Sequence, residues 1–178
     1  MNKLLTSQTG KHQTLFTTPI TLLVREGVGQ YRVPTPDEVL FSAWALLAEQ
    51  VKPGRTLGTP QDVQDYLRLE IGPLECEVFG AVFLDAQHRI IDLRNIFRGT
   101  VSETSVYPRE IVKESLACNA AALILFHNHP SGLAEPSRAD EYITQTLKSA
   151  LALVDVRVLD HLIVGQTQVV SMAERGLV

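Results

Sequence analysis

Residues 121–140 read AALILFHNHPSGLAEPSRAD, and this stretch decides the fold and the chemistry that we expect. Its first part, Ala121–Phe126, is an uninterrupted apolar run, which is typical of a strand buried on both faces of a sheet. Pro130 and Gly132 then end the strand and turn the chain, because proline cannot donate to a strand ladder and glycine adopts turn conformations. Ser137, with an acidic residue three positions later, predicts the start of a helix.

Sequence patterns on both sides of this stretch predict an α/β fold in which helices flank a mixed β-sheet. Further strands are expected at Glu77–Asp85, His88–Phe97, Val101–Val106, Val156–Val164 and Val169–Met172. Helices are expected to begin at Thr35, Thr59, Pro108 and Ser137 and to end near Gln50, Gly72, Asn119 and Leu153. Strands that alternate with helices are typical of a mixed sheet with helices packed against it.

The first third of the chain predicts a small N-terminal α+β arm over residues 1–73, ahead of a main domain at residues 74–178. The segment Gly27–Gly29 between short apolar runs indicates a β-hairpin in the arm. Both helices of the arm begin with Thr-Pro and have an acidic residue three positions after the threonine, which is typical of a helix N-terminus. No residue of the arm points to a chemical role.

The composition excludes several classes of protein. The 178 residues carry a net charge of −4, from 16 Lys and Arg against 20 Asp and Glu, so there is no basic excess of the kind that nucleic-acid binding usually requires. Two cysteines, Cys76 and Cys118, are too few for a disulfide scaffold and indicate a reducing compartment. No apolar run approaches the ~18–20 residues of a membrane span, and no signal-peptide pattern is present. We therefore expect a soluble cytoplasmic protein without a membrane partner.

His127, His129 and Asp140 form a candidate metal site. Side chains alternate along a strand, so His127 and His129 point to the same side and both can bind one metal ion. Asp140 lies in the first turn of the next helix, where the positive end of the helix dipole favours a carboxylate. Two histidines and one carboxylate leave a fourth position for water, which is the arrangement of a catalytic zinc. Such a zinc lowers the pKa of its water to about 7 and polarises a carbonyl group.

A zinc site of this kind needs a general base that is not itself a ligand. Glu77 stands directly before a buried strand, where a carboxylate is costly unless it has a partner. Glu75 projects to the same side one pleat earlier, and the sequence leaves the choice between the two open. Ser137, at the N-terminus of a helix, places a hydroxyl where it could steady the water or a developing oxyanion.

Each of these residues also has a purely structural interpretation. Ser137 and Asp140 make a plain capping box, and Glu77 could lie on the surface at the end of a strand. The pattern as a whole favours a metal site, because the two histidines end an all-apolar strand and a carboxylate follows at a suitable spacing. His161, in a late strand, is interpreted as a structural histidine.

The spacing of these residues resembles the H-x-H-x7-S-x2-D signature of the JAMM/MPN metalloproteases. The chain has His127, His129, Ser137 and Asp140 at the signature positions. Flanking segments are similar to the RadC-like branch of that family, namely Phe83-Leu84-Asp85, Arg98-Gly99-Thr100, Tyr107–Ile111, Asn119-Ala120-Ala121, His127–Gly132 and Asp160-His161. The resemblance covers about residues 74–178, which is more than half of the chain.

The resemblance implies a cytidine-deaminase-like JAMM/MPN fold with Zn²⁺ bound by His127, His129 and Asp140. It implies Glu77 as the general acid/base, Ser137 as the partner of the water or oxyanion, and hydrolysis of a peptide or isopeptide bond in a peptide or protein substrate. Full-length members usually carry a helix-hairpin-helix region, whose glycine pattern the arm lacks, so the chain is more similar to shorter, mobile-element-type relatives. The association of the family with DNA repair is a label that these residues do not themselves support.

Three other functions compete with a zinc peptidase. A zinc deaminase of related fold needs H-x-E and P-C-x-x-C ligands, which this chain lacks. A nuclease is suggested by the tripeptide His127-Asn128-His129, but the nuclease motif of that name spreads its residues over a longer hairpin and helix. A catalytically idle module that binds a protein or DNA partner would not need the complete set of candidate site residues, and the acidic charge argues against DNA.

Overall fold

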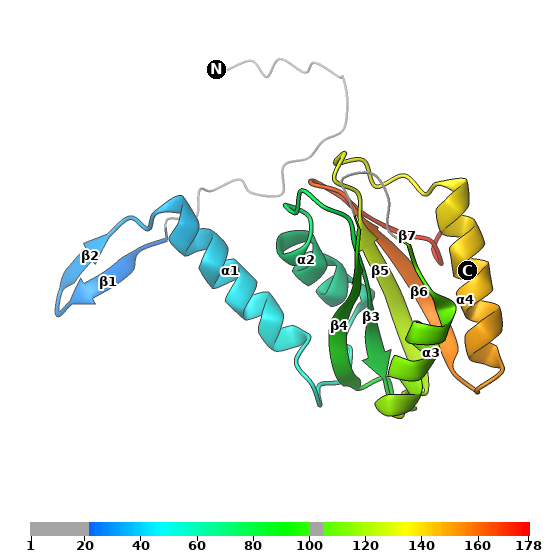
Figure 1. Cartoon of the computed structure of the whole chain (residues 1–178). Helices are drawn as coiled ribbons and strands as arrows, with labels where there is room; N and C mark the ends of the chain where they lie inside the picture. Colours follow the sequence, from blue (N-terminus) through cyan, green and yellow to red (C-terminus); the bar gives the residue numbers. More distant parts are fainter. Residues whose placement is uncertain (1–21, 100–104) are drawn as a thin grey trace, which may run out of the picture. The chain divides into compact units, whose positions relative to one another are not determined.

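The computed structural model describes residues 22–99 and 105–178 (Figure 1). The chain divides into two units, with the boundary between Val39 and Leu40. Among the helices of the described residues, none is both long and apolar enough to cross a membrane.

The first unit contains the expected hairpin. β1 (Val24–Gly27) pairs antiparallel with β2 (Gln30–Arg32). α1 (Pro36–Gln50) follows, and its start is a capping box. The Thr35 amide donates to the Glu38 carboxylate at 2.8 Å, and the Glu38 amide donates to Thr35 Oγ1 at 3.3 Å. The Thr-Pro pattern therefore marked this helix start correctly.

The second unit is built on a five-stranded mixed sheet. Its strands are β3 (Val78–Leu84), β4 (Ile90–Arg98), β5 (Ala122–Asn128), β6 (Arg157–Val164) and β7 (Val169–Ser171). Their order across the sheet is β4-β3-β5-β6-β7. Only β5 and β6 are parallel neighbours, and the other neighbouring pairs are antiparallel. The mixed sheet expected from the sequence is confirmed.

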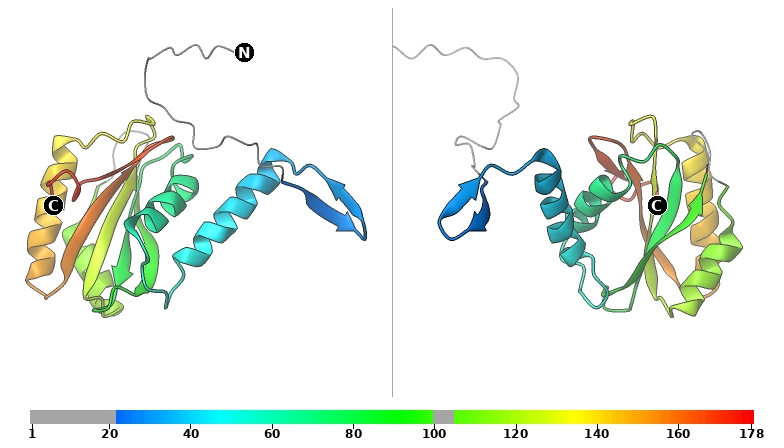
Figure 2. Two further views of the ribbon diagram at one scale, coloured as in Figure 1. Left: turned by 180° about the vertical axis from the view of Figure 1, so that it is seen from behind. Right: turned by 60° about the vertical axis from the view of Figure 1, so that its left-hand side comes forward.

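Helices cover both faces of this sheet. α3 (Pro108–Ala117) and α4 (Arg138–Ala152) lie against one face, and α2 (Pro60–Glu70) lies against the other (Figures 1 and 2). The core under α3 and α4 contains Phe79, Ala81, Phe83, Ile111, Leu123, Leu125, Leu147 and Leu151. The core under α2 contains Val63, Leu67, Ile71, Val82, Leu84, Ile124, Phe126 and Val164. Because helices cover both faces, every residue of β3 and β5 is buried, which explains their continuous apolar sequences.

Some element boundaries differ from those expected. α3 ends before Asn119, because Asn119 adopts a left-handed φ of 55° that a helix cannot continue. β4 begins only at Ile90, because His88 adopts a φ of 58° in the turn before it. The strand expected at Val101–Val106 falls largely on residues 100–104, which lie outside the described residues.

The expected arm and main domain share part of their packing. α2 contributes Val63, Leu67 and Ile71 to the core on one face of the sheet. Trp44 Nε1 of α1 donates to Glu70 Oε2 of α2 at 2.6 Å. The boundary after residue 73 stays a sequence-based prediction, and in the structure α2 packs as part of the unit that holds the sheet.

Candidate metal centre

The end of β5 places the two histidines of the motif. His127 lies within the strand and pairs with Phe79 of β3 and Ile163 of β6, whereas His129 follows the strand. The His129 amide donates to the Val164 carbonyl at 2.9 Å, which extends the contact with β6 beyond the strand end. The loop then passes so close to Gly165 that a Cβ there would lie 2.4 Å from the Gly132 carbonyl oxygen. A glycine at 165 is therefore needed for this loop path.

The start of α4 places Asp140, and the capping box is present. The Asp140 amide donates to Ser137 Oγ at 3.2 Å, and the Ser137 amide donates to Asp140 Oδ2 at 2.7 Å. The Ser137 hydroxyl also donates to Asp140 Oδ2 at 2.6 Å. Asp140 Oδ1, by contrast, lies 3.2 Å from His127 Nε2. The capping and metal interpretations of Asp140 are thus compatible, because the cap uses Oδ2 and leaves Oδ1 facing His127.

Ser137 allows a test of the capping contribution. We predict that Ser137→Ala lowers the free energy of unfolding by about 1 kcal/mol, because the Asp140 amide loses its acceptor. Ser137→Gly should cost only a few tenths of a kcal/mol, since glycine is a good N-cap residue although it also lacks the hydroxyl. Urea unfolding of both variants in the presence of a chelator measures this difference. Equal losses of stability in the two variants would contradict the capping role.

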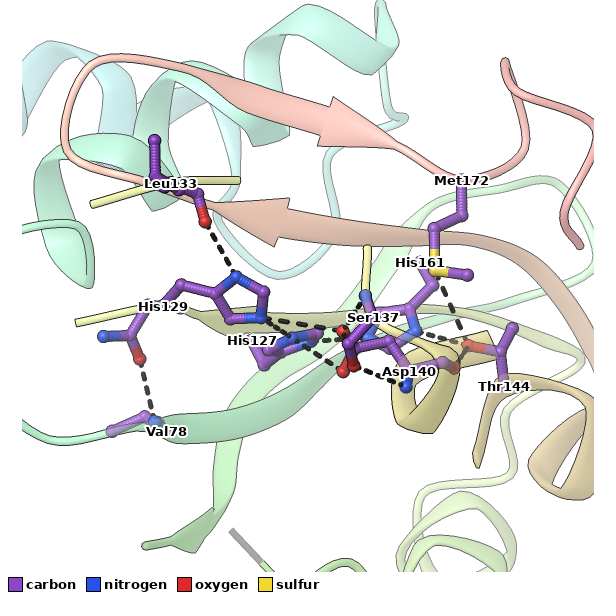
Figure 3. Close-up of polar contacts among 10 residues, drawn as sticks. Val78, His127, His129, Leu133, Ser137, Asp140, Thr144, His161 and Met172 are labelled. Carbon is purple, nitrogen blue, oxygen red and sulfur yellow. Dashed lines mark hydrogen bonds and ion pairs between the residues drawn. The ribbon is translucent and has the colours of Figure 1, made fainter. Parts of the chain in front are cut away.

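His127, His129 and Asp140 bring three metal-binding atoms together (Figure 3). These atoms all lie within 4.8 Å of one another. His127 Nε2 is 2.9 Å from His129 Nε2, and His129 Nε2 is 3.6 Å from Asp140 Oδ2. Ligand atoms about 2.0–2.1 Å from a tetrahedral zinc lie about 3.3 Å from one another. The donor set and its spacing therefore fit a zinc ion.

The orientation of His129 supports the same conclusion. His129 Nδ1 lies 2.8 Å from the Leu133 carbonyl oxygen, which can only accept, so Nδ1 carries the hydrogen. In the neutral ring, Nε2 then presents a lone pair toward His127 and Asp140. A metal ion needs such a lone pair on each of its histidine ligands.

The pKa values of Asp140 and His129 are both shifted from their usual values. Burial acts to raise the pKa of the Asp140 carboxyl, but its close contacts with His127 and His129 outweigh burial and hold that pKa well below its usual range. The hydrogen bond with Asp140 raises the pKa of His129, and burial opposes this rise. An ionised carboxylate beside two imidazole nitrogens attracts a cation to this point.

Glu77 lies in the cavity that opens onto the cluster. The cavity has a volume of about 760 Å³, and its lining includes Glu77, His129, Ser137 and Asp140. The charge of Glu77 adds a small contribution to the raised pKa of His129. Glu75 is exposed and is not among the described residues that line this cavity.

Asn128 fixes the chain on both sides of Glu77. Its fully buried side chain accepts from the Val78 amide at 2.8 Å and donates to the Cys76 carbonyl at 3.1 Å. The β3–β5 ladder ends at the pair of Phe79 and His127, so the Asn128 amide continues the pairing by one residue. The position of Glu77 is therefore set by the residue that stands between the two histidines.

Two further residues lie beside the cluster and were not predicted to do so. His161 was interpreted as structural, but His161 Nε2 lies 2.8 Å from His127 Nδ1. Thr144 was not singled out, and its Oγ1 lies 2.6 Å from His161 Nδ1. Only the presence of His161 in a flanking motif could have pointed to the site, since neither spacing nor periodicity links these residues to His127.

Comparison with known proteins identifies the family. A family model described as "RadC-like JAB domain" matches residues 57–177. The chain belongs to the RadC-like JAB-domain family. A UPF0758 protein of Leptothrix cholodnii is 56% identical over 159 residues, which cover 89% of this chain and 72% of the relative. A UPF0758 protein of Polaromonas is 56% identical over 163 residues, covering 92% of this chain and 73% of the relative. A third UPF0758 protein, from Nitrosomonas eutropha, is 54% identical over 152 residues, which cover 85% of this chain and 68% of the relative.

The RadC-like match confirms the family inferred from the histidine motif. The mixed sheet with flanking helices is consistent with a JAB/MPN fold. The matched segment begins at Leu57 and so includes α2 as well as the sheet. The names of these relatives state no activity, so the chemistry of the site has to be argued from its geometry.

Proposed function

We propose that this RadC-like protein is a zinc-dependent metallohydrolase that cleaves a peptide or isopeptide bond. The observation that carries the proposal is the convergence of His127 Nε2, His129 Nε2 and Asp140 at one end of an open cavity. These three residues would hold the zinc. A zinc ion bound there supplies Lewis-acid chemistry, which activates water and polarises a carbonyl group.

Glu77 is proposed as the general base and acid. It lines the cavity with the metal-binding residues but is not one of them, as proton transfer in such a site requires. Its carboxylate would take a proton from the attacking water and deliver it to the leaving amine. The Asn128 side chain, which binds the Val78 amide and the Cys76 carbonyl, holds the backbone on both sides of Glu77.

Ser137 is proposed to act on the oxyanion. Its hydroxyl lines the cavity beside Asp140 and at the N-terminus of α4, where developing negative charge is stabilised by the helix dipole. In the structure this hydroxyl donates to Asp140 Oδ2, so it would have to turn from that oxygen to the substrate.

The lining of the cavity supports a peptide or protein substrate. Phe79, Val106, Tyr107 and Ile143 contribute apolar and aromatic surface next to the polar cluster. Such a mixture suits a peptide side chain beside a polarised carbonyl group. Both cysteines are unpaired, and we therefore propose that the protein works in a reducing compartment such as the cytoplasm.

The proposal is tested with zinc-loaded protein and a library of bacterial proteome-derived peptides. We expect new peptide termini, detected by mass spectrometry, that disappear when a chelator removes the metal and return when zinc is added. His129→Ala, which lacks one metal-binding residue, is the control for cleavage by contaminating proteases. Zinc-loaded protein that cleaves nothing in the library or in an isopeptide-linked substrate set, or cleavage that persists in His129→Ala, would contradict the proposal.

A further inference from the structure

A buried polar chain connects the metal-binding histidine of β5 to helix α4. His127 is 1% exposed, and His161 and Thr144 are fully buried. His127 Nδ1 lies 2.8 Å from His161 Nε2, and His161 Nδ1 lies 2.6 Å from Thr144 Oγ1 (Figure 3). The Thr144 hydroxyl lies 2.5 Å from the backbone carbonyl oxygen of Asp140. The chain therefore begins at one metal-binding residue and ends at the backbone of another.

The chemistry of these groups assigns every hydrogen in the chain. A backbone carbonyl oxygen can only accept, so the Thr144 hydroxyl must donate to Asp140. Thr144 has no second hydrogen to offer, and its oxygen therefore accepts from His161 Nδ1–H. His161 is fully buried and, among the described residues, its two ring nitrogens face only Thr144 Oγ1 and His127 Nδ1, with no carboxylate against either, so the neutral ring is the form that suits this position. His161 Nε2 consequently carries a lone pair and accepts a hydrogen bond from His127 Nδ1–H.

This assignment decides the state of His127. With the hydrogen on Nδ1, the neutral ring carries its lone pair on Nε2, the atom that faces His129 and Asp140. The opposite tautomer would present a hydrogen to the metal position. Phe79 holds both rings in place, because it stacks on His127 at 6.0 Å between ring centroids and meets His161 edge-on at 5.4 Å.

We propose that His161 and Thr144 are positioning residues that hold His127 in the orientation and tautomer required to bind zinc. They do so as a relay that runs from the Asp140 carbonyl through Thr144 and His161 to His127. The relay ties β5, β6 and α4 together, so that the side chains of His127 and Asp140 approach the metal from elements fixed to each other. This inference rests on the proposed zinc site and adds two residues to it.

The relay is tested by zinc affinity, with zinc itself as the probe and a chromophoric chelator as the competitor. Partners that orient a metal-binding histidine usually account for about 10- to 100-fold in affinity. We expect His161→Leu to weaken zinc binding by about that factor, because His127 Nδ1 loses its acceptor. Thr144→Val, which keeps the shape but removes the hydroxyl, should weaken binding about 10-fold.

Thr144→Ser is the matched control, since serine keeps the hydroxyl and loses only a methyl group. The zinc affinity of Thr144→Ser should remain within about threefold of the wild type. If Thr144 acted only through the packing of its methyl group, Thr144→Ser would instead weaken zinc binding. Thermal unfolding with chelator present shows that each variant is folded. If Thr144→Val binds zinc as tightly as Thr144→Ser, the relay is wrong.

The tautomers are read directly from nitrogen-15 NMR spectra of the imidazole rings in the metal-free protein. We expect His127 and His161 both to carry their hydrogen on Nδ1, and a hydrogen on His127 Nε2 would overturn the relay. The proposed zinc site and the relay can fail separately. Wild-type protein that binds no zinc overturns the proposed function, whereas wild-type zinc binding that is indifferent to both His161→Leu and Thr144→Val overturns the relay alone.

Discussion

Glu77→Gln is expected to abolish peptide hydrolysis while leaving zinc binding intact. Glutamine has nearly the same shape, but it cannot accept the proton of the attacking water. Loss of general acid–base catalysis usually slows a reaction by about 10²- to 10⁴-fold. Zinc content should stay at about one ion per chain, because His127, His129 and Asp140 are unchanged. Cleavage rates and elemental analysis of the same preparations measure both quantities.

Glu75→Gln is the matched control for this prediction. Glu75 lies two residues before Glu77, in a bend and not in the extended segment expected from the sequence, and of the two only Glu77 lines the cavity. We expect Glu75→Gln to retain nearly full activity. If the two substitutions exchanged their effects, the general base would be Glu75, and a fully active Glu77→Gln would remove Glu77 from the mechanism.

His129→Ala is expected to lose the zinc. Removing one of three metal-binding groups should weaken zinc binding by more than about 100-fold, since even the partners that orient such groups account for about 10- to 100-fold. The change should leave the fold largely intact, because the His129 side chain is 20% exposed and stands after the end of β5. Elemental analysis should fall from about one zinc per chain to less than about one tenth.

His88→Asn is the control for nonspecific zinc binding by histidines. His88 is exposed in the turn before β4, and asparagine tolerates its left-handed backbone conformation. This variant should keep its zinc. Zinc should also raise the unfolding temperature of the wild type and of His88→Asn but not of His129→Ala, because a ligand stabilises only a folded protein that binds it. Equal zinc contents in all three proteins would contradict the site.

Local sequence patterns predicted most of the fold. The continuous apolar runs at 78–84 and 122–126 identified β3 and β5, because strands covered on both faces have no polar side. The Thr-Pro and Ser-x-x-Asp patterns identified the starts of α1, α2 and α4, because capping depends on residues only three positions apart. The C-terminal end of α3 and the start of β4 were each placed two residues away from their positions in the structure, since left-handed residues such as Asn119 and His88 are not obvious from sequence.

By itself the sequence determined which side chains are available for the chemistry. The spacing of His127, His129 and Asp140 follows from strand alternation and the first turn of a helix, and both are properties of near neighbours in the chain. The tertiary structure alone decided what surrounds them. It placed Glu77 rather than Glu75 in the cavity, left Asp140 Oδ1 outside the cap and facing His127, and set His161 against His127. That last contact joins residues 34 positions apart through the parallel pairing of β5 and β6, and such a pairing is fixed by the packing of the whole sheet and not by any local pattern.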